Sequence, residues 1–316
     1  MTARSILELR AAVRKRVRDL FDDLGFVEVD TPVLSREVLP EAHIDPIAVP
    51  LDGGPARFLQ ASPEALMKRL LAAGSGPIYQ LARSFRAGER GHQHDVEFVL
   101  LEWYSPGTTL ADAADLLARL CERALGTQGI ERVSCSAAFG AHAGVDPLSA
   151  PLDDMLAAIG RAGIAVPEAW AAAAPADRWD RAFEILLAEV VQPRLGHDRP
   201  TMLEAWPASQ AAFARLDPEA GGTARRFELF VRGVELANGW EEETRREVVA
   251  ARIAGANAAR QADGRPPLPE PARLLAAHGE AMPDGVGAAL GFDRLVMLAA
   301  GAASIDAVRP FSSADA

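Results

Sequence analysis

Apolar residues near the start of the chain follow a helical period. They recur at steps of three and four residues, at Leu9, Val13, Val17, Leu20 and Leu24, and this spacing predicts an amphipathic helix. Gly25 supplies a C-terminal stop, and residues 26–30 then alternate between apolar and polar side chains, as a short strand does.

The later strands are predicted in hairpins. Residues 77–81 and 97–104 have strand character and flank a charged loop that contains glycine. A second hairpin is predicted over 227–237, with its turn at Arg232-Gly233, and a further strand near 202–206. Strands that come in hairpins favour an antiparallel sheet over a doubly wound parallel one.

Helical patterns fill most of the remaining chain. The stretch 110–192 is alanine-rich and helical, with its clearest amphipathic part at 180–191. A charged helix is predicted over 242–262, and a glycine-rich strand from Gly285 leads into a helix at 293–300. A shorter helix is predicted to open at Ser62-Pro63-Glu64, with Ser62 as the cap and Pro63 in the first turn.

We therefore expect an α+β fold in one domain. No internal repeat and no linker between two compositions divides residues 1–316, and the helical segment near 110–200 is predicted to be an insertion.

Charge and cysteine content limit the partners and the compartment. The chain has 44 acidic and 33 basic residues, a net charge of -11, which argues against a long nucleic acid because phosphate binding needs a basic surface. Two cysteines, Cys121 and Cys135, cannot staple 316 residues, and buried thiols are expected. No signal peptide or membrane span is predicted, so we expect a cytoplasmic protein.

Charge concentrates first in the loop of the first hairpin. A strand delivers Arg86 to this loop, and the return strand carries Phe98. Arginine donates bidentate hydrogen bonds that suit phosphate, and an aromatic ring can stack on a base. On its own, the loop is better explained as an ordinary charged hairpin tip.

Two further segments also allow either a ligand-binding function or an ordinary structural role. Carboxylates cluster from Glu235 to Glu243 around a turn-like break predicted at Asn238-Gly239, and Mg²⁺ takes one or two carboxylates beside substrate phosphates. For Glu241 and Glu243 we prefer a role at the N-terminal dipole of the next helix. The glycine-rich segment 285–294 passes close under a ligand or packs tightly against a helix that Asp293 caps, and alone it is weak evidence.

Taken in order, these segments resemble the three signature motifs of class II aminoacyl-tRNA synthetases. The match is nearer to the lysyl-tRNA synthetase branch and nearest to its short paralogues, the elongation factor P lysyltransferases. It covers nearly the whole chain and is carried by the strings GFVEVDTP at 25–32, SPE at 62–64, MKRLL at 67–71, RSFR at 83–86, EF at 97–98, LEWY at 101–104, PASQ at 207–210, ELANG at 235–239 and LGFDRLVM at 290–297.

The resemblance implies a fold and an activity. The fold is a class II synthetase-like antiparallel β-sheet flanked by helices, without an anticodon-binding domain, because the first motif's helix begins within ten residues of the start. The activity is ATP- and Mg²⁺-dependent activation of lysine or β-lysine as an adenylate, followed by transfer to a lysine of elongation factor P. A homodimer packed through that first helix is also implied.

The resemblance also implies roles for single residues. Arg86 and Arg294 are the catalytic pair, on the α- and γ-phosphates of ATP, and Glu235 holds Mg²⁺. The implied ATP-binding set is Arg86, Ala87, Gly88, Glu89, His94, Asp95, Phe98, Glu235, Leu236, Gly291 and Arg294. The implied amino-acid set is Ser62, Pro63, Glu64, Tyr104, Asn238 and Glu242. In it, Tyr104 and Glu242 recognise the distal ammonium, because an unpaired buried charge would be costly.

The chain departs from the family pattern in three places. Asp95-Val96 stands where the family has Asn-Pro or His-Pro. The Arg-x-Glu step is lengthened by one residue between Arg86 and Glu89, which leaves the adenine-reading glutamate open by one position. The run 241–243 leaves the lysine-specific carboxylate open in the same way.

Two alternatives to the implied function stand beside it. One keeps the adenylation but has another acceptor, a carrier protein or a small amine. The other is a catalytically silent paralogue that binds an amino acid or nucleotide, which the presence of Arg86, Glu235 and Arg294 disfavours.

Overall fold

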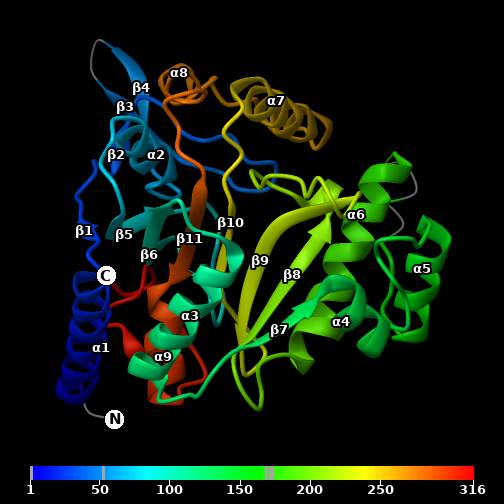
Figure 1. The fold of residues 1–316 in the computed structure, drawn as a ribbon, viewed down its shortest axis with the longest axis horizontal. Coiled ribbons are helices and arrows are strands. Elements are labelled where there is room, and N and C mark those ends of the chain that lie inside the picture. The colour runs from blue at the N-terminus through cyan, green and yellow to red at the C-terminus, as the bar shows by residue number, and fades with distance from the viewer. Residues whose placement is uncertain (1–2, 52–53, 168–169, 171–173) are drawn as a thin grey trace. The chain divides into compact units, whose positions relative to one another are not determined.

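The computed structural model describes residues 3–51, 54–167, 170 and 174–316 (Figure 1). Contacts between Cα atoms group the chain into two compact units. Unit 1 is made of Met1–Thr109, Glu122–Gly126 and Glu242–Ala316, and unit 2 of Leu110–Cys121 and Thr127–Glu241.

The strands of unit 1 form two sheets. They are β1 (Val27–Glu28), β2 (Leu34–Ser35), β3 (Ile47–Leu51), β4 (Gly54–Leu59), β5 (Ile78–Phe85), β6 (Glu97–Pro106) and β11 (Gly285–Gly291). In the larger sheet, β1 runs parallel to β5, and β5, β6 and β11 pair antiparallel in that order. The smaller sheet is antiparallel, in the order β2-β4-β3. The predicted first hairpin is confirmed, and its first strand extends to Phe85, directly before Arg86.

The helices of unit 1 contact its larger sheet or one another. They are α1 (Ala3–Asp23), α2 (Glu64–Ala72), α7 (Arg246–Ala262), α8 (Ala272–Ala277) and α9 (Phe292–Ala300), with a 3-10 turn η5 (Ile305–Val308). The predicted first helix is confirmed, since Val13, Val17 and Leu20 of α1 are buried and Gly25 follows its end at φ +77°. The helix α1 lies beside α9 (Figure 1).

The strand β6 separates the core of unit 1 from the residues implied in chemistry. Side chains of a strand alternate between its faces. On one face Trp103 is buried, with its ring 5.5 Å from that of Phe21, a residue of α1. On the other face lie Phe98, Glu102 and Tyr104, and α2 packs against this strand.

Unit 2 has four strands and its own core. Its strands are β7 (Glu131–Ser134), β8 (Thr201–Pro207), β9 (Thr223–Val231) and β10 (Val234–Glu241), and its helices include α4 (Cys135–His142), α5 (Leu152–Arg161) and α6 (Pro175–Leu186). The order is β10-β9-β8-β7, with β7 parallel to β8 and the other pairs antiparallel. The core centres on Phe183, whose ring lies 4.7 Å from that of Phe139 and 5.6 Å from that of Trp206. The helix α3 (Leu110–Leu125) crosses the boundary between the units.

Some predicted elements are wrong in unit 2. The helical stretch at 110–192 is interrupted by β7, because pairing with β8 imposes a strand that the local pattern does not signal. Within that stretch, residues 168–169 and 171–173 lie outside the described residues. The helix predicted at 180–191 begins earlier, at Pro175, and passes into a π turn at Leu187–Val191.

The predicted break at Asn238-Gly239 is also wrong. Both residues lie inside β10, opposite Glu228 and Phe227 of β9, so the ladder overrides the local turn preference. The sheets are not wholly antiparallel either, since β1–β5 and β7–β8 are parallel pairs.

Helix starts differ from the predictions as well. The helix predicted at 242–262 begins only at Arg246, so neither Glu241 nor Glu243 lies in its first turn. Pro63 rather than Ser62 is the N-cap of α2, and the Ser62 hydroxyl accepts a hydrogen bond from the Glu64 N–H at 3.3 Å. Asp293 does not cap α9, because its Oδ2 accepts from the Val99 N–H at 2.9 Å.

Both cysteines are buried free thiols, as predicted, and burial raises the pKa of Cys121 to about 12. Within the part of the chain that the structure describes, no helix is long and apolar enough to span a membrane.

Phe183→Ala is expected to destabilise the protein, because it leaves a cavity among stacked aromatic rings. The expected loss in the free energy of unfolding is about 3–5 kcal/mol. Chemical denaturation of the two proteins measures it. Leu148→Ala, at a 41% exposed side chain, is the control, and equal losses in the two variants would contradict the assigned core.

Candidate active site

The loop between β5 and β6 brings together two residues implied in nucleotide binding. The Arg86 N–H donates to the Val96 carbonyl at 3.0 Å, which closes the end of the hairpin. The Arg86 guanidinium lies 5.1 Å from the centre of the Phe98 ring and 3.6 Å from the Glu89 carboxylate. Ala87 is fixed by a backbone hydrogen bond to Asp45, and Gly88 turns the chain at φ +75°. A cation and an aromatic face are thus held side by side, as binding of a phosphate and a base requires.

Arg294 joins this loop from α9. Its Nη2 donates to Nε2 of His94 at 2.7 Å, and its Nε donates to the Gln93 carbonyl at 3.2 Å. Because a guanidinium cannot accept a hydrogen bond, the His94 imidazole is neutral at Nε2 and carries its proton on Nδ1. Gly291 lies against the aliphatic part of Arg294, and a Cβ there would be 3.4 Å from Cδ.

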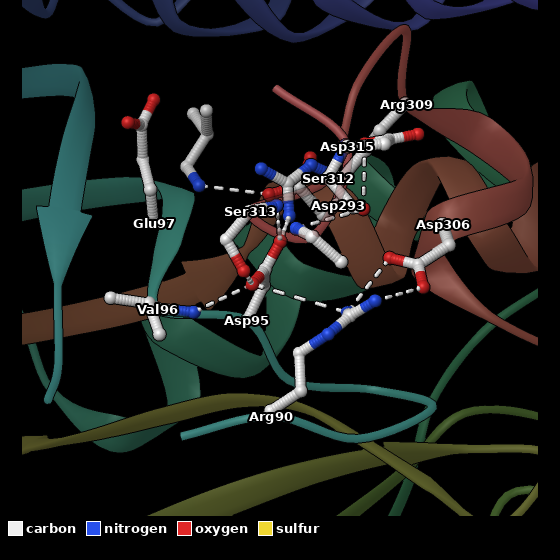
Figure 2. Close-up of polar contacts among 12 residues, drawn as sticks. Arg90, Asp95, Val96, Glu97, Asp293, Asp306, Arg309, Ser312, Ser313 and Asp315 are labelled. Atoms are coloured by element: carbon white, nitrogen blue, oxygen red, sulfur yellow. Dashed lines mark hydrogen bonds and ion pairs between the residues drawn. The ribbon is translucent and has the colours of Figure 1, made fainter. Parts of the chain in front are cut away.

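Asp95 faces the interior rather than solvent. It is 0% exposed, and its carboxylate accepts hydrogen bonds from Val96, Arg309 and Ser313 (Figure 2). Asp95 thus lies in the loop where the motif predicts it, but its side chain contacts Arg309 and Ser313 near the C-terminal end of the sequence.

A second cluster, the acidic pocket, lies on the same face of β6. It consists of Glu64, Lys68, Glu102, Tyr104 and Glu242, all buried. The Lys68 ammonium lies 2.6 Å from Glu64 Oε1 and 2.7 Å from Glu242 Oε2. The Tyr104 hydroxyl donates to Glu102 Oε1 at 2.7 Å. Among the described residues, none donates a hydrogen bond to Glu102 Oε2.

Burial and charge shift the protonation equilibria of the acidic pocket. Burial alone would lower the pKa of Lys68, but the carboxylates of Glu242 and Glu64 outweigh it and raise that pKa. Burial and the charge of Glu64 raise the pKa of Glu102 well above its ordinary value. The pocket holds three carboxyl groups and one lysine, so it favours a further positive charge or a proton.

The structure distinguishes the three neighbouring glutamates that the sequence left open. Glu241 ends β10 and pairs with Arg215 and Arg225 at 2.7 and 3.0 Å. Glu243 pairs with Arg245 at 2.7 Å. Only Glu242 of the three contacts Lys68 in the acidic pocket.

A glycine makes room for the acidic pocket. Gly287 of β11 lies opposite Tyr104, and a Cβ at this position would collide with the Tyr104 ring and the Glu242 carboxylate. Glycine is thus needed here for close approach, which the sequence pattern suggested for the whole segment.

Unit 2 carries Glu235, Leu236 and Asn238 on β10. Leu236 is buried, and a bulge between Glu235 and Ala237 inserts one extra residue. Glu235 lies opposite Phe230 and Asn238 opposite Glu228, partners two residues apart on β9. The bulge therefore puts Glu235 and Asn238 on one face of the strand, although they are three positions apart. Asn238 Oδ1 accepts from Arg226 Nε at 3.2 Å.

Three residues of these clusters were not predicted as site residues. Lys68 and Glu102 lie inside strings that carry the family resemblance. A lysine and a glutamate are rarely buried without a partner, so charged residues at core positions of a predicted helix and strand were the signal that could have found them. Arg226 had no such signal. It lies 4.0 Å from the Trp206 ring and 2.6 Å from Glu228 Oε1, which fixes its position beside Asn238.

The described residues would supply only part of the ligand set of Mg²⁺, and substrate phosphates and water would complete it. Among the described residues, no three His, Cys, Asp or Glu side chains gather into a metal-binding group. Mg²⁺ commonly takes one or two carboxylates and completes its shell with phosphates and water, and a half-buried Glu235 suits that arrangement.

Comparison with known proteins agrees with the motifs. Residues 1–315 match the family model described as tRNA synthetases class II (D, K and N). The chain is 40% identical over 311 residues to proteins named elongation factor P--(R)-beta-lysine ligase from Klebsiella pneumoniae and Edwardsiella ictaluri, covering 96% of this chain and 93% of each relative. The ligase of the same name from Sodalis glossinidius is 39% identical over 295 residues. The predicted fold class and family are confirmed.

Glu102→Gln is expected to stabilise the protein increasingly as pH rises. The folded chain retains a proton on Glu102 above the ordinary pKa of 4.5, where the unfolded chain has lost it. Ionisation of Glu102 therefore lowers stability with rising pH, and a neutral glutamine removes that loss. Thermal unfolding from pH 4.5 to 8 measures the difference between variant and wild type.

The matched control for this titration is Glu97→Gln, on the same strand but only half-buried and paired with Arg83. A difference between Glu102→Gln and wild type that stays constant across this pH range would contradict the raised pKa.

Proposed function

The chain belongs to the class II tRNA synthetase family of the D, K and N enzymes, and from that premise we propose that it is an ATP-dependent aminoacyl ligase. It activates lysine or β-lysine as an aminoacyl adenylate and transfers the aminoacyl group to a lysine of elongation factor P. The names of its 40% identical relatives support this acceptor and favour β-lysine.

The acidic pocket carries the proposal. Three carboxyl groups and one internal lysine leave an excess of negative charge on a buried surface. A lysine-like amino acid has two ammonium groups and one carboxylate, and its net charge of +1 offsets that excess. A neutral isostere would leave Glu102 Oε2 without a donor, which explains selection against it.

The nucleotide is assigned to the neighbouring loop. Phe98 and Glu102 lie on one face of β6 and are four residues apart, which is about 13 Å along a strand. That distance lets an adenine ring at Phe98 and the distal ammonium of an amino acid at Glu102 belong to one extended adenylate. Arg86 holds the α-phosphate and Arg294 the γ-phosphate. Neutral His94, which accepts from Arg294, keeps that guanidinium oriented.

Activation then proceeds by in-line displacement. A carboxylate oxygen of the amino acid attacks the α-phosphorus, a new P–O bond forms, and pyrophosphate leaves with the electron pair of the broken bond. Arg86 stabilises the charge that develops on the α-phosphate. When bound by Glu235 and the phosphates, Mg²⁺ supplies further charge neutralisation.

Transfer completes the reaction. The neutral amine of the acceptor lysine attacks the adenylate carbonyl, the bond from that carbon to the phosphate oxygen breaks, and AMP leaves with its electron pair. The nitrogen loses one proton to solvent, and an amide bond remains. The first step needs no general base, because positioning and charge stabilisation promote it.

The assembly and location belong to the same proposal. We expect the whole chain to act as one catalytic domain, as a cytoplasmic homodimer packed through α1, and without reading a tRNA anticodon.

Arg86→Ala is expected to abolish ATP–pyrophosphate exchange with every amino acid, because the α-phosphate loses its cation. The assay is run with lysine, both β-lysine enantiomers and other amino acids, with and without elongation factor P. Arg83→Ala, at an exposed arginine of the same hairpin, is the control and should exchange normally. Absence of exchange in the wild type with all amino acids would refute both enzyme hypotheses, and exchange without transfer would indicate another acceptor.

Glu242→Gln is expected to raise the KM for the amino acid by about tenfold or more, the effect of losing one charged hydrogen bond, while the KM for ATP stays within twofold. Its matched control is Glu243→Gln, since the neighbouring carboxylate pairs with Arg245 instead. Equal and mild effects of the two variants on both constants would argue against Glu242 in substrate selection.

A further inference from the structure

A cluster of polar contacts joins the C-terminal segment, residues 305–316, to the loop between β5 and β6. Figure 2 shows the Asp95 carboxylate facing Ser313 and Val96, with Arg90 reaching towards Asp306. Asp95 Oδ2 accepts from Arg309 Nη1 at 2.6 Å and from the Ser313 N–H at 2.9 Å. Oδ1 accepts from the Ser313 hydroxyl and from the Val96 N–H, the latter at 2.8 Å.

Two more contacts join the same parts of the chain. Arg90 forms a bidentate pair with Asp306, at 3.0 and 2.7 Å. The Ile305 N–H, at the start of η5, donates to the His92 carbonyl at 2.9 Å. The loop is therefore held at three successive points, residues 90, 92 and 95, by one short segment.

The C-terminal segment has local structure that holds Ser313 in place. The N–H and hydroxyl of Ser312 both donate to Asp315 Oδ1, at 2.5 and 2.7 Å. The Ala316 N–H donates to the Ser312 carbonyl at 3.0 Å. These bonds form a turn, so Ser313 presents two donors to Asp95 from a fixed position.

Asp95 carries a full charge in this setting. Burial opposes ionisation, but the hydrogen bonds from Ser313 and Val96 and the charge of Arg309 outweigh it and lower the pKa of Asp95. With both oxygens occupied and no exposed surface, Asp95 meets the C-terminal segment and not a nucleotide. An acceptor-only carboxylate also explains why the chain departs from the family's Asn-Pro or His-Pro here.

The contacts continue to the groups assigned to ATP. His94 is bonded to Asp95 through one peptide, and its Nε2 accepts from Arg294. Displacement of Asp95 would therefore displace His94 and the guanidinium that leans on it.

We propose that residues 309–313 of the C-terminal segment position the ATP-binding loop by hydrogen bonding to Asp95, and that they thereby fix the positions of His94 and Arg294. This inference rests on the proposed ATP-binding function of the loop. Asp95, Arg309 and Ser313 are positioning residues in it, because none of them touches the reacting atoms.

The test combines two readouts on the full-length protein. Amide hydrogen exchange of residues 88–96 is measured without nucleotide for wild type and for the double variant Arg309→Gln/Ser313→Ala. The same proteins are assayed by ATP–pyrophosphate exchange for the KM of ATP, the KM of the amino acid and kcat. Thermal unfolding of each variant verifies that it is folded.

We expect the double variant, which removes the side-chain bonds of Arg309 and Ser313 to Asp95, to lose protection in the loop and to raise the KM for ATP about tenfold or more. The KM for the amino acid should stay within twofold. The bonds described for the acidic pocket join Lys68 to Glu64 and Glu242, and Tyr104 to Glu102, and none of these five residues is changed in the variant. Arg309→Lys keeps the charge, so it should raise the KM for ATP less than the double variant does. Arg273→Gln makes the same charge change at an exposed arginine paired with Glu37, and it should leave both readouts unchanged.

Two outcomes would overturn the inference. One is unchanged loop protection in the folded double variant. The other is a loosened loop with an unchanged KM for ATP, or with equal rises in both KM values. Failure of the proposed function is distinguishable, since it appears as absent pyrophosphate exchange in the wild type itself.

Discussion

The buried ion pairs of Lys68 are the interaction on which the rest of unit 1 depends. Its ammonium lies between Glu64 and Glu242, and all three groups are nearly inaccessible to water. Burying two carboxylates without a cation would cost several kcal/mol for each ion. Lys68 makes the acidic pocket possible, and Glu102 supplies the carboxyl oxygen that has no donor among the described residues.

That pocket and the loop between β5 and β6 share one strand. Alternation along β6 sends Val99, Leu101 and Trp103 into the core beneath α1 and α9, and it sends Phe98, Glu102 and Tyr104 to the opposite face. The hydrophobic packing that stabilises the strand thus fixes the spacing of the polar residues as well. Gly287, on the next strand, keeps the space above Tyr104 open.

Long-range contacts hold the loop between β5 and β6 in addition to the bonds of its own hairpin. The loop is short and rich in glycine and charge, and local forces alone would leave it many conformations. Arg294 supports it from α9, and Asp95 anchors it through Arg309 and Ser313. Because Asp95 is an ionised, fully buried carboxylate, each of its donors is costly to remove, and the loop is held in a narrow set of positions.

The sequence alone determined the first helix, the hairpins and the family. Periodicity reports which side chains share a face, and short motifs keep their residues together, so the nearness of Arg86 to Phe98 and the strand at Gly285 were predictable. Only the tertiary structure decided that Lys68 balances the pocket, that Glu242 and not its neighbours joins it, and that Asp95 turns towards the C-terminal segment. It also decided that a bulge aligns Glu235 with Asn238. Each of these depends on groups from distant parts of the chain meeting within hydrogen-bond distance, or on an extra residue in a paired strand, and no local pattern records such a meeting.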